Sequence, residues 1–409
     1  KKSKIINCTI KMQKIIIQSI EKELPNRLLY RLTVGDQQEE AHIEVNKMYA
    51  DYLVTDRIDS LVWGLLQFAI NKGYDIESAL PITEDLWYNL EMNLIDPLAA
   101  NPGMHRIHIQ APLVPVMNHA EIVATGISCG VDSLYTIATH GENVPKPYRL
   151  THLCFFDAGS HNTGLQDDSS TKLFQGRMDL CRRFAEEYNY GFILIKNDVY
   201  ELLNRHGGYS HVENHTFMAL SCIYALQGAF AKYFYSAGCS IREFSCVKSK
   251  ENFQLDAAHY DILTLNSASI PGLDFISTGG SLDRIAKTKT IADYDPAYKY
   301  LNVCVTAVEN DSTCFKCVRT MLTLDALGKL DKFSAVFDVQ YYMNHRKRYI
   351  EKTICTAEYP GNGFALWRDN GIPEWVGNCI KLFRSALYLQ LIEGSQSIDR
   401  DYRDSYSGC

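Results

Sequence analysis

Apolar and polar positions follow two different patterns along the 409-residue chain. Over residues 27–47 they alternate on both sides of the polar stretch DQQEE, which predicts a β-hairpin. Residues 60–73 carry apolar positions at helical spacing and end on a glycine, which predicts a helix that closes at Gly73. Residues 105–116 return to strand character. These elements predict an N-terminal α+β module over residues 1–118.

From about residue 119 the pattern changes to strands that alternate with helices. The expected strands are 121–128, 149–159, 191–198, 242–249, 273–280 and 300–307. The expected helices are 132–140, 170–190, 216–238, 318–330 and 375–389. Strands with near-continuous apolar runs, separated by helices, are typical of a mostly parallel, doubly wound α/β sheet. We therefore expect an α/β domain over residues 119–325 and a helical C-terminal region over residues 326–409.

Composition narrows the classes of partner. The formal net charge of −7 argues against a nucleic acid as the main partner, because phosphate contacts need a basic field. The basic stretch at residues 345–352 is typical of a solvated helix face. No apolar run is long enough to cross a bilayer, and Lys11 and Lys14 interrupt the apolar N-terminus where a signal peptide would be continuous. Thirteen dispersed cysteines favour a reducing, cytoplasmic location over a disulfide framework.

A turn of small and polar residues, SCGVDS at positions 128–133, separates an expected strand from an expected helix. Backbone N–H groups at such a helix N-terminus attract anions. Ser128 and Ser133 add hydroxyl donors, and Gly130 allows a phosphate to approach the backbone. Asp132 would repel a phosphate unless it binds a metal or caps the helix. The stretch lacks the Walker pattern, so it predicts a different phosphate-binding loop, with a turn that binds no ligand as the alternative.

This loop resembles the Ser-Gly-Gly-x-Asp-Ser motif of the N-type ATP pyrophosphatases, the PP-loop superfamily, which cleave ATP between its α and β phosphates and adenylate a substrate. The resemblance implies that Mg²⁺ lies near Asp132 and that the whole loop binds ATP. The implied nucleotide-binding residues of the loop are Ser128, Cys129, Gly130, Val131, Asp132 and Ser133. Cys129 stands where the motif has its first glycine. Because only the backbone there need contact phosphate, the motif is kept if the local φ suits a non-glycine residue.

Two cations follow a second small-residue turn within residues 277–294. Arg284 and Lys287 are three positions apart and share one face if the segment is helical. Cleavage of an α–β phosphate bond requires positive charge on the leaving pyrophosphate, and the superfamily uses a distal Lys or Arg for it. Lys287 is the first choice and Arg284 the second. The alternative is a pair of ordinary surface cations.

Two further positions are candidates for nucleotide contact. Asp157 follows the second expected strand of the α/β region, at the edge that contacts adenosine in the superfamily. Its alternative role is a helix or turn cap. Asn214 lies just before a buried helix, where relatives bind nucleotide or substrate, but Glu213 replaces the arginine typical of those relatives. A simple N-cap is an equal alternative for Asn214.

Three cysteines form a C-x9-C-x2-C pattern, which is typical of tetrahedral zinc. A redox pair and buried thiols are the alternatives. The segment with Cys304, Cys314 and Cys317 resembles the zinc knuckle of 7-cyano-7-deazaguanine synthases, and Asp311 stands where that family has its second cysteine. The resemblance implies a structural Zn²⁺ with Asp311 as the fourth ligand, since carboxylate oxygen binds zinc and structural zinc contributes folding energy. A three-coordinate site or a lost metal is the alternative.

Taken together, the motifs resemble an enlarged relative of these synthases. The resemblance implies an ATP-dependent ligase that adenylates a small-molecule carboxylate, a 7-deazaguanine-type acid, releases pyrophosphate and forms an amide or nitrile. Larger relatives occur in bacterial anti-phage gene clusters, which implies a protein acceptor or a defence-system partner. One alternative is a tRNA-thiolating enzyme with Cys129 or Cys154 as the nucleophile. The other is a non-catalytic nucleotide-sensing subunit of a defence complex.

Overall fold

The computed structural model describes residues 13–160, 168–250 and 253–358. The chain divides into two compact units. The first contains Lys1–Ile127 and His140–Thr278, and the second contains Ser128–Thr139 and Gly279–Cys409. The predicted phosphate-binding loop, the two predicted cations and the cysteine pattern all belong to the second unit.

A ten-stranded sheet forms the centre of the first unit, in the order β12-β11-β8-β9-β10-β3-β2-β1-β4-β6. The strands, in chain order, are β1 (Gln13–Leu24), β2 (Arg27–Val34), β3 (Gln37–Val45), β4 (Tyr74–Ser78), β6 (Ile109–Gln110), β8 (Ile122–Gly126), β9 (His152–Asp157), β10 (Gly191–Asn197), β11 (Phe230–Ser236) and β12 (Asp274–Thr278). Strands β8 to β12 pair in parallel, as do β1 with β4 and β4 with β6, whereas β1–β2, β2–β3 and β3–β10 are antiparallel. The predicted α/β class with a mostly parallel sheet is therefore confirmed. A short parallel pair, β5 (Ile82–Thr83) and β7 (Leu113–Val114), lies outside this sheet.

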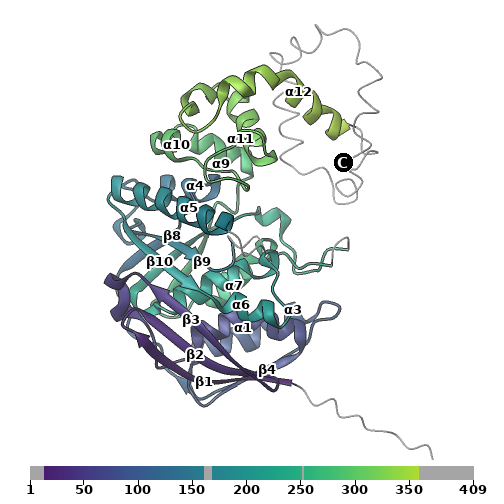
Figure 1. The fold of residues 1–409 in the computed structure, drawn as a ribbon. Helices are drawn as coiled ribbons and strands as arrows, with labels where there is room; N and C mark the ends of the chain where they lie inside the picture. The colour runs from purple at the N-terminus through teal and green to yellow at the C-terminus, as the bar shows by residue number, and fades with distance from the viewer. Residues whose placement is uncertain (1–12, 161–167, 251–252, 359–409) are drawn as a thin grey trace, which may run out of the picture. The chain divides into compact units, whose positions relative to one another are not determined.

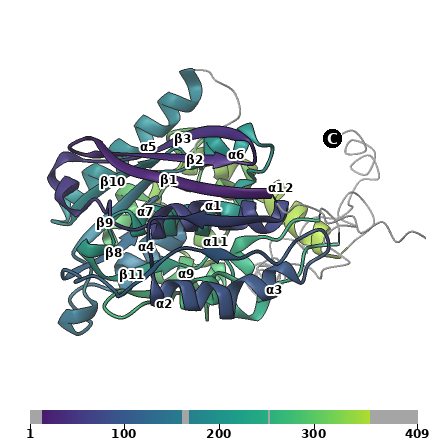
Figure 2. The same ribbon diagram turned by 90° about the horizontal axis from the view of Figure 1, so that it is seen from below.

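Helices cover this sheet from both sides. They are α1 (Asp59–Lys72), α2 (Glu84–Asn89), α3 (Ile95–Ala99), α5 (Asp168–Glu187), α6 (Val199–Arg205), α7 (His211–Tyr224) and α8 (Asp261–Ala268). Figure 1 shows α5 on one side of β8–β10 and α1, α6 and α7 on the other. Tyr30 of β2 donates a hydrogen bond to Ser60 of α1 at 3.4 Å, and Figure 2 shows α1 running along the N-terminal strands. As predicted, α1 closes at Gly73, whose left-handed φ of 73° costs glycine nothing.

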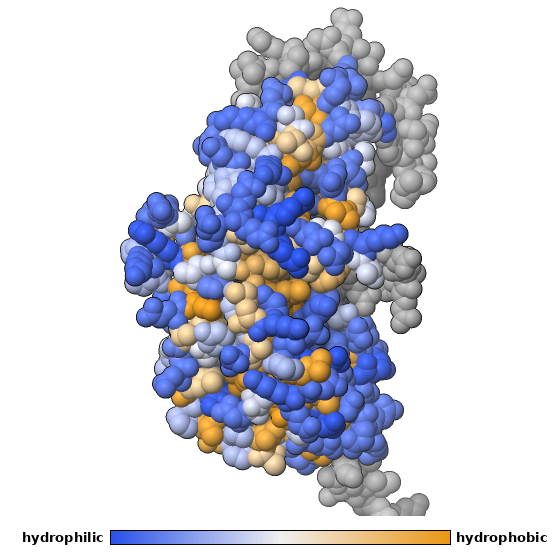
Figure 3. All heavy atoms as spheres, turned by 60° about the vertical axis from the view of Figure 1, so that its left-hand side comes forward, coloured by the Kyte–Doolittle hydropathy of each residue, from blue (hydrophilic) through white to orange (hydrophobic). Residues whose placement is uncertain are grey.

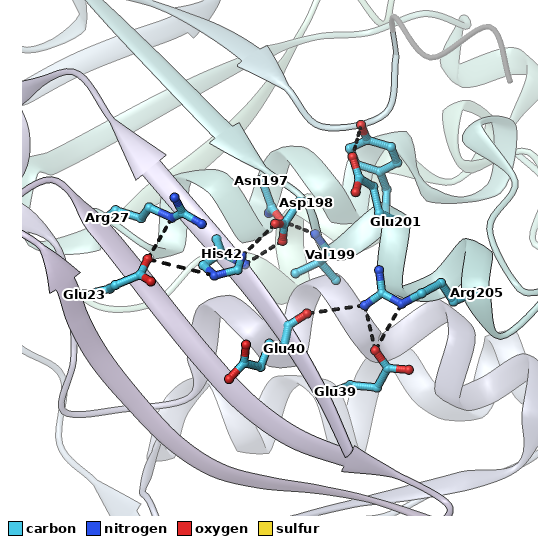
Figure 4. Close-up of polar contacts among 11 residues, drawn as sticks. Glu23, Arg27, Glu39, Glu40, His42, Asn197, Asp198, Val199, Glu201 and Arg205 are labelled. Carbon is cyan, nitrogen blue, oxygen red and sulfur yellow. Dashed lines mark hydrogen bonds and ion pairs between the residues drawn. The ribbon is translucent and has the colours of Figure 1, made fainter. Parts of the chain in front are cut away.

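Polar side chains connect the N-terminal hairpin to the α/β part of the sheet (Figure 4). His42 of β3 donates its backbone N–H to Asp198, which follows β10, and its ring Nδ1 lies 2.9 Å from the same carboxylate. Glu39 of β3 accepts from Arg205 of α6 at 2.6 Å. The expected module of residues 1–118 thus contributes strands to the same sheet as β8–β12. Its independence as a domain stays a prediction.

The described part of the second unit consists of helices and the loops between them. Its helices are α4 (Val131–Thr139), α9 (Arg284–Ile291), α10 (Asp295–Tyr300), α11 (Phe315–Ala326) and α12 (Val339–Glu358). Helix α11 confirms the helix predicted over residues 318–330. The helix predicted over residues 375–389 lies outside the described residues. Helix α9 packs against both α4 and α11, which places the segments with the predicted site residues next to one another.

The prediction of one long helix over residues 216–238 is wrong in its second half. Helix α7 ends at Tyr224, and the chain turns through Gly228 into β11. The segment FAKYFYS is rich in aromatic residues, which fit a pleated sheet better than a helix. Strand β11 pairs with β8 on one side and β12 on the other, so its place inside the sheet favours a strand over a helix.

Three other predicted boundaries also change. Residues 242–249 form no strand, because Ser240 and Glu243 make a capping box that starts a short 3₁₀ helix. Residues 301–307 of the strand predicted over 300–307 form a loop, because Asn310 accepts from two backbone N–H groups of that segment. The hairpin turn is shorter than expected, and most of the DQQEE stretch belongs to β3.

Apolar side chains are also present on the surface. Met48, Val247 and Phe253 are among the exposed ones. The face drawn in Figure 3 mixes hydrophilic and apolar residues, which is ordinary for a folded protein. Within the described part of the chain, every helix falls short of the length and apolar character that a membrane span requires.

Candidate anion and metal sites

The loop of residues 128–133 closes tightly at the start of α4. The Gly130 N–H donates to Ser128 Oγ at 3.3 Å, and Ser133 Oγ donates to the Gly130 carbonyl at 3.1 Å. The two serine hydroxyl oxygens, both predicted as phosphate donors, lie 3.3 Å apart. The chain enters this loop directly from β8. Strands β9 and β10 lie on one side of β8, and β11 and β12 lie on the other, so the direction of the strand order reverses at β8. In open α/β sheets, ligands bind outside the carboxyl ends of strands at such a switch point.

Cys129 adopts the backbone conformation of the glycine that it replaces. Its φ is 57°, in the left-handed region, and its side chain is fully buried. Its carbonyl accepts a hydrogen bond from the Asn302 N–H at 2.8 Å, which holds the loop in this shape. A non-glycine residue in this region costs about 1–2 kcal/mol. The loop therefore keeps the glycine geometry of the motif at an energetic cost.

The predicted catalytic residues lie together, although more than 150 positions separate them in the chain. Asp132 accepts from Arg284 Nη1 at 2.6 Å and from Lys287 Nζ at 3.1 Å. The prediction that the two cations share a helix face is confirmed, because both project from α9 to one carboxylate. The Lys287 side chain is only 2% exposed. A side chain at Gly279 would begin 2.8 Å from Lys287 Cε, so this glycine makes room for the lysine.

The arrangement of Asp132 does not fit a preformed magnesium site. Each of its two oxygens accepts from a cation, so Mg²⁺ would compete with two ion pairs for this carboxylate. The group of potential metal ligands identified among the described residues is the cysteine cluster. Mg²⁺ therefore stays a prediction, and no step below depends on it.

Lys316 is a charged residue that the sequence analysis missed. It lies between Cys314 and Cys317 at the start of α11, and it is half-buried. Burial lowers the pKa of Lys316, and the charges of Arg319 and Arg284 lower it further. The Asp132 carboxylate acts in the opposite direction. Lys316 therefore lies within electrostatic reach of the same ion pairs as the loop. Its position inside a C-x-x-C pattern was the available signal.

The four predicted metal ligands come together at one point. One ligand atom from each of Cys304, Asp311, Cys314 and Cys317 lies within 4.8 Å of all the others. Cys314 caps α11, and its Sγ accepts from the Cys317 N–H at 3.5 Å. Three sulfurs and a carboxylate at this spacing fit tetrahedral zinc, so the cluster could hold a metal such as zinc.

The surroundings of the cluster shift the pKa values of Asp311 and Cys317 in opposite directions. Burial opposes ionisation of Asp311, but the N–H groups of Cys314 and Thr313 outweigh it and hold the pKa of Asp311 well below its usual range. Burial and the neighbouring Cys314 raise the pKa of Cys317. A divalent cation would reverse the second effect, because it deprotonates the thiols that coordinate it.

Asp157 and Asn214 belong to the first unit. Asp157 is the last residue of β9, and burial raises its pKa against the opposing charge of Lys196. Asn214 is fully buried and donates to the Ser210 carbonyl at 2.9 Å. Ser210 is the N-cap of α7, so the N-cap alternative for Asn214 is wrong. Because the loop lies in the second unit, the roles of both residues in nucleotide binding stay predictions.

The two cysteines considered as thiolation nucleophiles are both buried. Burial and the nearby Cys222 raise the pKa of Cys154 well above its ordinary value. The reactive form of cysteine is the thiolate, so this environment disfavours nucleophilic attack by Cys154.

Comparison of the chain with family models, curated proteins and solved structures gives no match. The function is therefore inferred from the geometry of the loop, the cations and the cysteine cluster.

Proposed function

We propose that this protein is an ATP-dependent ligase of the PP-loop type that adenylates a carboxylate and releases pyrophosphate. The observation that carries the proposal is the convergence of Asp132, Arg284 and Lys287 at the loop of residues 128–133. A buried lysine held beside a glycine-containing turn at a helix N-terminus is suited to an oligophosphate. The parallel strand order β12-β11-β8-β9-β10 supports an adenine nucleotide alpha hydrolase-like fold.

In the proposed reaction, a carboxylate oxygen of the substrate attacks the α phosphorus of ATP. A bond forms between that oxygen and phosphorus, and the bond to the β-phosphate oxygen breaks. Pyrophosphate leaves with the electron pair, and Lys287 and Arg284 neutralise its charge. The loop N–H groups and the hydroxyls of Ser128 and Ser133 bind the phosphates. An amine or ammonia then displaces AMP from the acyl adenylate and loses a proton to form an amide. A nitrile would follow from the primary amide only after a second ATP adenylates the amide oxygen, which then leaves with AMP.

By the same resemblance, the substrate is a 7-deazaguanine-type acid, and the acceptor is ammonia, an amine or a protein of a defence system. The cysteine cluster holds Zn²⁺ in a structural role in this proposal.

The test is ATP–pyrophosphate exchange with a panel of carboxylates that includes 7-carboxy-7-deazaguanine. We expect exchange with at least one acid and its loss in Lys287→Met. Lys289→Met is the matched control, because Lys289 lies on the same helix and is exposed. Absence of exchange with every acid, together with absence of ATP binding, contradicts the proposal.

A non-catalytic nucleotide sensor is the second candidate. This candidate is favoured by the two ion pairs of Asp132. Each carboxylate oxygen accepts from a cation, so neither oxygen is directed to a metal alone. Tight ATP binding without exchange or product under any acid would select this candidate.

A further inference from the structure

The loop of residues 128–133 depends on one residue in a conformation that its side chain disfavours. Cys129 has a φ of 57° and a fully buried side chain. A left-handed residue turns successive backbone N–H groups toward one side, which creates a concavity for an anion. For a residue other than glycine this conformation is disfavoured by a factor of about 5–30, so it persists only where neighbouring contacts hold it.

A contact from another segment of the same compact unit holds this conformation. The Asn302 N–H donates to the Cys129 carbonyl at 2.8 Å. The segment also lies against the next residue of the loop, because a side-chain carbon at Gly130 would be 3.7 Å from the Asn302 carbonyl. The shape of the loop is therefore held from outside, by the backbone of residues 301–304.

The side chain of Asn310 fixes this backbone. Its Oδ1 accepts from the Val303 N–H at 2.8 Å and from the Cys304 N–H at 3.2 Å. Its Nδ2 donates to the Leu301 carbonyl at 2.8 Å and to the Val336 carbonyl at 3.0 Å. Cys304 also contributes one of the four potential metal-ligand atoms. A metal held by the cluster would therefore fix one end of the segment that holds the loop.

We infer that phosphate binding by this loop is conditional on the metal cluster, because Cys129 stands where a glycine would adopt the same φ without cost. The ligand class is a pyrophosphate group, free or within a nucleoside triphosphate. This inference rests on the proposed function and adds a regulation of its phosphate site. Metal coordination orders the segment that carries Cys304, since binding energy supplies the ordering energy. Loss of the metal releases Asn302, and the loop then leaves the conformation that binds phosphate.

The experiment measures binding of inorganic pyrophosphate to the zinc-loaded full chain by calorimetry, with zinc content determined on the same samples. Asn302→Pro removes the N–H that the Cys129 carbonyl accepts and alters no metal ligand. It should weaken pyrophosphate binding about 5–30-fold, the fraction of loops that remain competent when Cys129 is unsupported. Asn302→Ala is the matched control, because it keeps this N–H and removes only the side chain, which donates to the Val308 carbonyl.

Replacement of Cys129 separates this mechanism from a general loss of structure. Cys129→Gly and Cys129→Ala both remove the thiol, but only glycine takes the left-handed conformation without cost. Asn302→Pro should therefore weaken binding as strongly in the Cys129→Ala protein as in the wild type, and should have little effect in the Cys129→Gly protein. Removal of zinc by a chelator should follow the same pattern, and added zinc should restore the affinity.

Equal losses in the glycine and alanine proteins overturn the inference and leave the proposed function standing. The same conclusion follows if wild-type affinity for pyrophosphate is unchanged by both Asn302→Pro and chelation. If the wild type binds neither pyrophosphate nor ATP, the inference and the proposed function are both overturned. Either arm decides the question alone: chelation if Asn302→Pro fails to fold, and Asn302→Pro if the zinc-free protein unfolds.

Discussion

Replacement of Asp132 by asparagine isolates the contribution of one carboxylate to the second unit. In the native protein this carboxylate accepts from Arg284 Nη1 at 2.6 Å and from Lys287 Nζ at 3.1 Å. The Lys287 side chain is 2% exposed, whereas those of Asp132 and Arg284 are 22% and 27% exposed. The variant keeps the shape of the side chain and removes its charge.

The expected loss in the free energy of unfolding depends on how exposed each ion pair is. A hydrogen bond to a charged group contributes about 1.5–3 kcal/mol, so the bond to the buried Lys287 is assigned about 2 kcal/mol. The partly exposed bond to Arg284 is discounted to about 1 kcal/mol because solvent screens it. The sum of about 3 kcal/mol corresponds to a melting temperature lower by about 6–12 °C, at about 2–4 °C per kcal/mol for a domain of ordinary size.

The same replacement should lower the stability of the fold but strengthen anion binding. The native carboxylate competes with a phosphate for Arg284 and Lys287, so Asp132→Asn should bind magnesium-free pyrophosphate more tightly than the wild type. A ligand at 100 times its dissociation constant stabilises the fold by about 2.7 kcal/mol, which offsets nearly all of the loss.

The assay is calorimetric melting with and without pyrophosphate. Asp331→Asn is the control, because Asp331 is an exposed carboxylate of the same unit. The reasoning is refuted if Asp132→Asn melts within about 1 °C of the wild type and pyrophosphate stabilises both proteins equally. In that case the observed ion pairs do not carry the stability assigned to them.

Three further changes test other parts of the molecule. The pKa of Glu39 is lowered, since its hydrogen bonds to cations outweigh burial. Glu39→Gln should therefore cost about 1–2 kcal/mol at pH 7. The difference from the wild type should begin to shrink as pH falls through the ordinary value of 4.5 and should vanish only below the lowered pKa of Glu39 in the folded protein. Hydrogen exchange measures the difference, with the exposed Glu40→Gln as a control that changes little. Asp311→Asn should lower zinc affinity by at least the factor of about 10–100 that loss of a partner outside the ligand sphere costs, measured in a competition titration with a chromophoric chelator, and equal affinity would exclude Asp311 as a ligand. Cys154 and Cys222 should resist iodoacetamide at pH 8 in the native protein, because burial raises the pKa of both thiols, that of Cys222 to about 12; rapid labelling seen by mass spectrometry would contradict this.

Local signals in the sequence predicted the elements that depend on local interactions. The hairpin of β2 and β3, the closure of α1 at Gly73 and helix α11 all follow from residue spacing and a terminal glycine. The three cysteines of the metal cluster were predictable from their spacing, whereas Asp311 was expected only from the resemblance to the zinc knuckle.

The remaining features depend on contacts that spacing does not encode. Residues 300–307 alternate like a strand, but hydrogen bonds to the side chain of Asn310 hold residues 301–307 as a loop. The segment that became β11 is apolar enough for a buried helix, and its pairing with distant strands decided otherwise. The influence of Arg284 and Asp132 on the pKa of Lys316 depends on the packing of α9 against α11, which residue spacing does not encode.

The pairing of β3 with β10 also has a consequence for the newly made chain. His42 and Asp198 are 156 positions apart, so at about 5–20 residues per second a ribosome needs about 8–30 s to supply the partner of β3 after β3 itself. During that interval the strand presents an unpaired edge of the kind that recruits other chains. Its sequence QQEEAHIEV carries three glutamates, whose repulsion discourages pairing with a second copy on the same polysome. Glu39, in this view, protects the strand during synthesis and binds Arg205 once the sheet is complete.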